Sequence, residues 1–151
     1  MGNEEYGGAM SKPEIAAFLE RQGHGVLSLG GEIPYSLPIS FGYDVFENRC
    51  IFQLLFPTDS RKRDRLEDTT GVSLVSYEWN DIDDWRSVVI TGPLCRIDDE
   101  SPAVMGASEV FAEHASVAGL SGFNRPMEEL DAEWYELDIE EMSGRHSPPV
   151  E

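Results

Sequence analysis

The sequence has very little positive charge. Only 11 of its 151 residues are lysine or arginine, against 29 aspartates and glutamates, which leaves a formal net charge of −18. Such a charge repels phosphate backbones, so nucleic acid is not an expected partner. Concentrated salt shortens the screening length to about 3 Å at 1 M, so a halophilic source is the simplest account of the charge. A mesophilic protein that happens to be acidic is the alternative.

Cysteines and long apolar runs are also scarce. Cys50 and Cys95 lack the close spacing of a zinc or redox motif, so we expect no disulfide framework and treat both as buried small hydrophobic residues. The three histidines, His24, His114 and His146, are too scattered for a metal site. No run approaches the roughly 18 apolar residues of a membrane span, and the first ten residues are acidic where a signal peptide would be basic. We therefore expect a cytoplasmic protein.

The length and composition predict one globular domain. Hydrophobic residues make up 40% of the chain and fall in short clusters separated by turn formers. We expect a domain over residues 11–145, with a flexible tail over 1–10 and another over 146–151. The chain contains neither a Gly-x-Ser-x-Gly elbow nor a Walker loop, so it lacks those signatures of hydrolases and nucleotide-binding proteins.

The local pattern predicts mostly strands. Ser11 caps a first helix that ends at Gly23, and two further short helices are expected over 59–66 and 101–119. Strands are expected over residues 24–29, 35–43, 50–56, 72–79, 85–97 and 134–139. Pro38 indicates an edge strand or a bulge, and Gly92-Pro93 should bend the long fifth strand. Six strands with two or three peripheral helices and no βαβ rhythm predict an antiparallel barrel.

A basic cluster stands out in a chain with so few cations. Four of the eleven basic side chains lie within five residues: Arg61, Lys62, Arg63 and Arg65. At the start of a short helix after Ser60, these groups can converge on one phosphate. The alternative is a solvated helix face on which the arginines pair with nearby acidic residues. The position directly after the most apolar strand favours the phosphate site.

An ordered set of segments resembles a known family. The segments are 34–44 (PYSLPISFGYD), 50–54 (CIFQL), 60–62 (SRK) with Leu66, 72–77 (VSLVSY) and 85–92 (WRSVVITG). In order and spacing they resemble the pyridoxamine 5′-phosphate oxidase-like superfamily, and within it the branch of nitroimidazole-resistance-type flavoproteins. The resemblance covers roughly residues 12–145. It implies a six-stranded antiparallel split barrel of Greek-key type that forms a homodimer and holds FMN in two clefts between the subunits.

The resemblance also implies a set of cofactor-binding residues. Three match the family's phosphate-binding motif, three match the strand whose backbone lies along the isoalloxazine ring, two match the next strand, and one lies where the true oxidases place a flavin-contacting glutamine. In that order they are Ser60, Arg61 and Lys62; Ile39, Ser40 and Phe41; Phe52 and Gln53; and Ser87.

The end of the chain departs from the true oxidases. They carry an Arg-x-His-x-Arg arrangement that grips pyridoxal phosphate, whereas this chain has only Arg145-His146 followed by Ser-Pro-Pro. We therefore do not expect vitamin B6 oxidation, and treat Arg145 and His146 as tail residues.

The expected function is that of a flavoprotein. Reduced FMN would pass hydride or electrons from a nicotinamide donor, NAD(P)H, to a small acceptor, and the flavin itself would carry the chemistry. No general acid or base emerges, so the catalytic residues stay unknown. The alternatives are a protein of this fold that binds the deazaflavin F420 or haem, a non-enzymatic flavin-binding redox or sensor module, or a cofactor-free interaction module.

Overall fold

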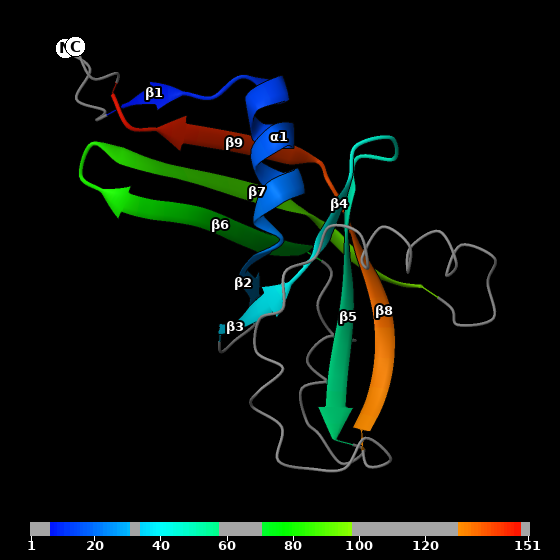
Figure 1. Cartoon of the computed structure of the whole chain (residues 1–151). Helices are drawn as coiled ribbons and strands as arrows, with labels where there is room; N and C mark the ends of the chain where they lie inside the picture. The colour runs from blue at the N-terminus through cyan, green and yellow to red at the C-terminus, as the bar shows by residue number, and fades with distance from the viewer. Residues whose placement is uncertain (1–6, 31–33, 58–70, 98–129, 149–151) are drawn as a thin grey trace.

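A computed structural model describes residues 7–30, 34–57, 71–97 and 130–148 (Figure 1). Within these ranges the chain forms one helix and nine strands. In chain order they are β1 (Gly8–Ala9), α1 (Lys12–Gln22), β2 (His24–Leu29), β3 (Tyr35–Ser40), β4 (Gly42–Asp44), β5 (Arg49–Pro57), β6 (Gly71–Asp81), β7 (Asp84–Ile97), β8 (Leu130–Asp138) and β9 (Glu141–His146). The helices expected over 59–66 and 101–119 lie outside the described residues.

The first helix begins and ends where the sequence indicates. The Ser11 hydroxyl accepts a hydrogen bond from the Glu14 N–H at 3.3 Å, and the Glu14 carboxylate accepts one from the Ser11 N–H at 3.0 Å, which forms a capping box. These bonds hold the pKa of Glu14 below its ordinary value. Gly23 ends the helix in the left-handed conformation, with φ of 66°. The buried face carries Ile15, Phe18 and Leu19 into the core.

The strands form one antiparallel sheet, as expected of a mainly β protein. Its hydrogen-bonded order is β3-β2-β6-β7-β8-β5-β4, with β9 paired to β7 and β1 paired to β9. The count is nine strands and not the predicted six. One reason is that the strand predicted over 35–43 divides at Phe41, whose N–H bonds to the Gly23 carbonyl at 2.9 Å instead of continuing a ladder.

The sheet is consistent with a split barrel but is not closed. β3 and β4, at the two ends of the order, are consecutive in the chain and are joined through Phe41; in the part of the chain described, no ladder links them. Pro38 lies in β3, at one end of the sheet order, as the prediction of an edge strand requires.

A second difference lies at the end of the chain. Arg145 and His146 belong to β9 and are not tail residues, because the last predicted strand continues beyond a bend at residues 139–140. Through this extension β9 pairs with Arg86–Thr91 of β7 on one side and with Gly8–Ala9 of β1 on the other. Neither β1 nor β9 was expected from the sequence.

Strand β7 changes partners at the predicted bend. Thr91 is the last residue of β7 that pairs with β9, and Leu94 is the first that pairs with β8. Between them, at Gly92, the β8–β9 connection crosses so closely that a Cβ atom would collide with the Asp138 carbonyl oxygen. The Glu140 N–H donates to the Thr91 carbonyl at 3.0 Å at the same point. Gly92-Pro93 thus divides the sheet into two halves.

The core lies between the sheet and α1. Alternate residues of the strands point into it, and Phe41 and Phe52 meet there edge to face, with ring centroids 6.5 Å apart. The predicted alternation over 134–139 is confirmed, since Tyr135, Leu137 and Ile139 are buried. No helix among the described residues is long and apolar enough to cross a membrane.

We predict that Gly92→Ala destabilises the fold through its close contact with the β8–β9 connection. The added methyl group would force backbone apart at the bend, at a cost of about 2–3 kcal/mol in the free energy of unfolding. Gly71→Ala is the matched control, because a Cβ there meets no atom within 4 Å, and its effect should stay within about 0.5 kcal/mol. Urea unfolding at one fixed salt concentration measures both. Equal effects of the two variants would contradict this account of the bend.

Candidate functional site

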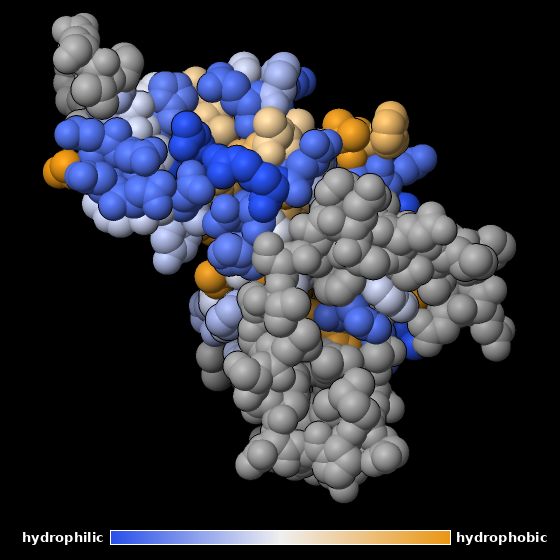
Figure 2. All heavy atoms as spheres, viewed as in Figure 1, coloured by the Kyte–Doolittle hydropathy of each residue, from blue (hydrophilic) through white to orange (hydrophobic). Residues whose placement is uncertain are grey.

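The half of the sheet formed by β3, β2, β6 and β7 has two different faces. The inward face packs against the core and α1, and is built from side chains such as Leu27, Leu74 and Ile90, all fully buried. The residues that alternate with them point away from the core, and among these Tyr77 and Val89 are 59% and 40% exposed. We call this second side the outer face. Figure 2 views the molecule from the side of α1, where hydrophilic side chains dominate the surface.

The strand register orders the outer face into rows. A hydroxyl row crosses four neighbouring strands and consists of Ser36, Ser28, Ser73 and Thr91. Two residues along each strand lies a parallel apolar row, which we call the valine row and which consists of Pro38, Val26, Val75 and Val89. A third, polar row follows from the same register and consists of Ser40, His24, Tyr77 and Ser87. Hydroxyl and apolar groups are therefore segregated on one sheet face.

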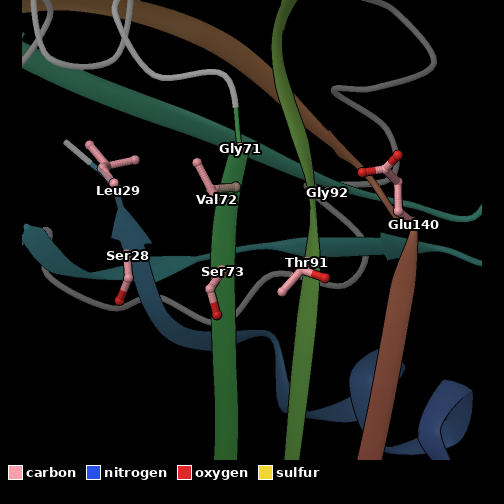
Figure 3. Close-up of a pocket in the computed structure, with 9 residues that line it drawn as sticks. Ser28, Leu29, Gly71, Val72, Ser73, Thr91, Gly92 and Glu140 are labelled. Atoms are coloured by element: carbon pink, nitrogen blue, oxygen red, sulfur yellow. The ribbon is translucent and has the colours of Figure 1, made fainter.

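A shallow hollow of about 430 Å³ lies where β2 ends and β6 begins, and it is lined by Leu29, Val72 and three glycines as well as by three residues of the hydroxyl row (Figure 3). Figure 3 shows Ser28, Ser73 and Thr91 side by side on β2, β6 and β7, with the Glu140 carboxylate at the edge. The Ser28 and Ser36 hydroxyls are hydrogen-bonded at 2.8 Å. A second hollow of about 460 Å³, which includes Lys12 and Asn48, adjoins the first and shares Thr91 and Glu140 with it.

The structure brings two of the predicted cofactor residues to the outer face. Ser40 and Ser87 both lie in the polar row, three strand spacings or about 14 Å apart. Gln53 lies in the other half of the sheet, on β5, opposite Trp134 of β8, and is partly exposed.

Of the other six predicted cofactor-binding residues, three are buried and three lie outside the residues that the structure describes. Ile39, Phe41 and Phe52 are 4%, 0% and 0% exposed, and their side chains belong to the core cluster. Any contact that they make with a ligand must come from the backbone, as the resemblance implies for Ile39 and Phe41. Ser60, Arg61 and Lys62 lie outside the described residues, so the phosphate motif is a prediction from sequence.

The hydroxyl row was not anticipated from the sequence. The alternation of Ser73 with Val72 and Leu74 indicates that Ser73 points away from the core. Its neighbours across the sheet, Ser28 and Thr91, follow only from the register of three strands that are distant in the chain. That register was the missing information.

Several charged side chains outside the outer face form ion pairs with one another. Arg49 bonds to the carboxylates of Asp44 at 3.2 Å and Glu136 at 2.8 Å. Glu78 accepts hydrogen bonds from Arg21 and Arg86, and the bond from Arg21 lowers the pKa of Glu78. Within the described ranges, no group of three His, Cys, Asp or Glu side chains is arranged to hold a metal ion.

A family model described as pyridoxamine 5′-phosphate oxidase matches residues 11–146, which is most of the chain. The chain belongs to this family. The match spans the outer face, both hollows and the predicted phosphate motif. Among curated proteins, none matches the sequence of this family member significantly.

Solved structures share the fold of this oxidase-family chain at low sequence identity. An FAD-binding protein from Mesorhizobium loti has a TM-score of 0.69 at 18% identity, over 93% of this chain and 97% of its own. A candidate 5-nitroimidazole antibiotic resistance protein from Bacteroides thetaiotaomicron has a TM-score of 0.65 at 12% identity, over 97% and 95%. An FAD- and haem-binding protein from Mycobacterium smegmatis has a TM-score of 0.63 at 14% identity, over 93% and 74%. The expected likeness to the nitroimidazole-resistance type is thus confirmed at the level of the fold.

The two cysteines differ in their surroundings, contrary to the expectation that both are buried. Cys50 is fully buried in the core, and burial raises the pKa of its thiol far above the ordinary range. Cys95 is exposed, because it points outward from β7, and its thiol pKa is raised by partial burial and by the charges of Glu136 and Asp138.

We predict that a thiol reagent such as DTNB modifies one cysteine per folded chain and two per unfolded chain. Because the raised pKa keeps Cys95 largely protonated at neutral pH, its reaction should accelerate as the pH rises above the ordinary cysteine value of about 8.5. Cys95→Ser is the control and should remove the reaction of the folded protein. Two rapidly reacting thiols in the folded state would contradict the burial of Cys50.

Proposed function

We propose that this chain is a flavin-binding oxidoreductase that works as a homodimer in the cytoplasm. The observation that carries the proposal is the outer face, where a partly exposed apolar row runs beside a row of hydroxyls. A flavin nucleotide has the same division, with an aromatic ring system at one end and a hydroxylated chain at the other. Membership of the oxidase family and the FAD-binding proteins of the same fold support a flavin as the ligand.

The side chains on the outer face match the chemical groups of a flavin. The valine row offers apolar side chains against which one face of an isoalloxazine ring can lose its water, and Ser40 and Ser87 offer hydroxyls beside it. We assign the phosphate to Ser60, Arg61 and Lys62 on the basis of the sequence motif, and therefore favour FMN. When bound, the flavin would supply hydride or electron transfer between NAD(P)H and a small acceptor.

A second copy of the chain is the proposed cover of the outer face. Val89 and Tyr77 expose apolar surface on this face, and Trp79 is 61% exposed further along β6. Exposed aromatic and aliphatic side chains grouped on one sheet face are typical of a protein interface. A flavin between two copies would be shielded on both sides, whereas one copy alone would leave half of it in water.

Haem is less well supported as the ligand, although one protein of this fold binds FAD and haem. His24 lies on the outer face, but both of its ring nitrogens are near Gln22, one 3.0 Å from the backbone carbonyl and the other 3.4 Å from the side-chain nitrogen. Binding iron through His24 would require breaking these contacts. A flavin requires no such change.

The proposed phosphate site gives an internal comparison within the basic cluster. Arg61→Ala and Lys62→Ala should each weaken FMN binding by about 1.5–3 kcal/mol, or roughly ten- to a hundred-fold, because each removes a charge-assisted hydrogen bond to a dianion. Arg63→Ala and Arg65→Ala are the matched controls and should change the affinity little. FMN titrations at one high salt concentration, where distant charges are screened, measure all four.

The protein purified in molar salt should be yellow and should release FMN on denaturation. A colourless protein that fails to bind added FMN would refute the proposed function, and a Soret band would indicate haem instead. If all four variants of the basic cluster bind FMN like the parent, the cluster is a solvated helix face. A dominant effect of Arg63 or Arg65 would move the phosphate site by one turn.

A further inference from the structure

The hairpin of β6 and β7 projects beyond the strand that flanks it (Figure 1). Pairing of β6 with β2 ends at Val75 and Val26, whereas β6 continues to Asp81 and pairs with β7 up to the tip. The other edge of the hairpin is covered, because β9 pairs with β7 and the Ser147 N–H donates to the Trp85 carbonyl at 2.9 Å. In the described part of the chain, no strand pairs with the edge of β6 beyond Val75.

The backbone groups of Trp79 point to this open edge. The Tyr77 carbonyl points away from β7, because it accepts a hydrogen bond from the Gln22 side chain at 2.8 Å. Residues two apart on a strand direct their backbone groups to the same side, so the N–H and carbonyl of Trp79 point the same way. Trp85, which lies opposite Trp79, directs its own N–H and carbonyl to Ser147 on the far side. Trp79 thus offers one donor and one acceptor to an added strand.

The side chains around this edge are apolar and acidic. Three large apolar side chains are 59%, 61% and 62% exposed, in this order: Tyr77, Trp79 and Ile82. Residues 78–84 carry four carboxylates, and the two guanidinium groups that pair with them belong to Arg21 and Arg86, so two negative charges remain in excess. Edge strands that stay unpaired often carry lysine or proline, and residues 77–81 contain neither. The edge therefore matches a segment with apolar and cationic side chains.

We propose that the edge of β6 at Trp79 is a docking site for a partner protein, which adds an extended segment of alternating apolar and basic residues as a further strand. The apolar side chains of that segment lie beside Tyr77 and Trp79, and its cations lie near the aspartates of the turn. A second copy of the hairpin does not fit, because antiparallel pairing centred on Trp79 places its tip beside Val75, where β2 already lies. Trp79 belongs to none of the three rows of the outer face, so this site is separate from the proposed flavin site.

A synthetic hexapeptide of alternating lysine and valine, blocked at both ends, is the probe, and hydrogen exchange of the tryptophan amides is the readout. Protein labelled with ¹⁵N-tryptophan gives a backbone signal for each of Trp79, Trp85 and Trp134. Saturating peptide should slow exchange of the Trp79 amide about ten-fold or more, because this amide gains a hydrogen bond, and should leave the other two unchanged. A hexapeptide of alternating glutamate and valine should not bind.

Two substitutions separate the backbone of Trp79 from its side chain. Trp79→Pro removes the outward N–H without removing a bond to β7, and should abolish peptide binding. Trp79→Ala keeps the N–H and should weaken binding about ten-fold, as expected for loss of an aromatic anchor. Phe46→Ala is the matched control, because Phe46 is 95% exposed in a different turn, and it should bind the peptide like the parent. Thermal unfolding checks that each variant is folded.

Several results would overturn the proposal. They are no binding of the basic peptide, equal binding of the acidic peptide, binding that leaves exchange of the Trp79 amide unchanged, and equal losses in the Phe46 and Trp79 variants. A Trp79 amide that is already protected in the protein without peptide would also overturn it, because this chain or a second copy would then cover the edge. None of these results bears on flavin binding.

Discussion

The structure depends on the close contact between Gly92 of β7 and the connection between β8 and β9. Without a side chain at Gly92, the backbone of Asp138 and Glu140 can cross β7 at contact distance, and the Glu140 N–H bonds to the Thr91 carbonyl. At this point β7 changes its partner, and it pairs with β9 before Gly92 and with β8 after it. A single long strand thereby belongs to both halves of the sheet.

The same bend creates the candidate site. It places Thr91, the last residue of β7 before the change of partner, at the end of the hydroxyl row and next to Glu140, where the two hollows adjoin. The inward residues of β6 and β7 are used by the core, so the outward residues are free to differ in chemistry from row to row. Packing of one face therefore fixes the geometry of the other, and the spacing of the rows on the outer face is set by the strand ladder.

Local signals in the sequence were enough to predict α1 and most strands, because capping residues, turns and alternation act over a few neighbouring residues. Ser11, Gly23 and the alternation over 134–139 are examples. Strand β9 was missed because Gly144, Arg145 and His146 show no apolar alternation, and their pairing with β7 is a long-range interaction. The phosphate motif at Ser60, Arg61 and Lys62 stays a prediction from the sequence. The alignment of Ser28, Ser73 and Thr91 depends on the strand register, which one sequence does not contain.

The central claim is that the outer face is covered by a flavin and a second copy of the chain. Light scattering and FMN titration of Val89→Glu test it most directly, because the change places a charge in the valine row without touching the core. Phe46→Glu is the comparison, since Phe46 is 95% exposed in the turn between β4 and β5 and belongs to none of the three rows of that face. The account predicts a dimeric parent and a dimeric Phe46 variant that bind FMN alike, and a monomeric Val89 variant with weakened FMN binding. A Val89 variant that stays dimeric and binds FMN like the parent would contradict it.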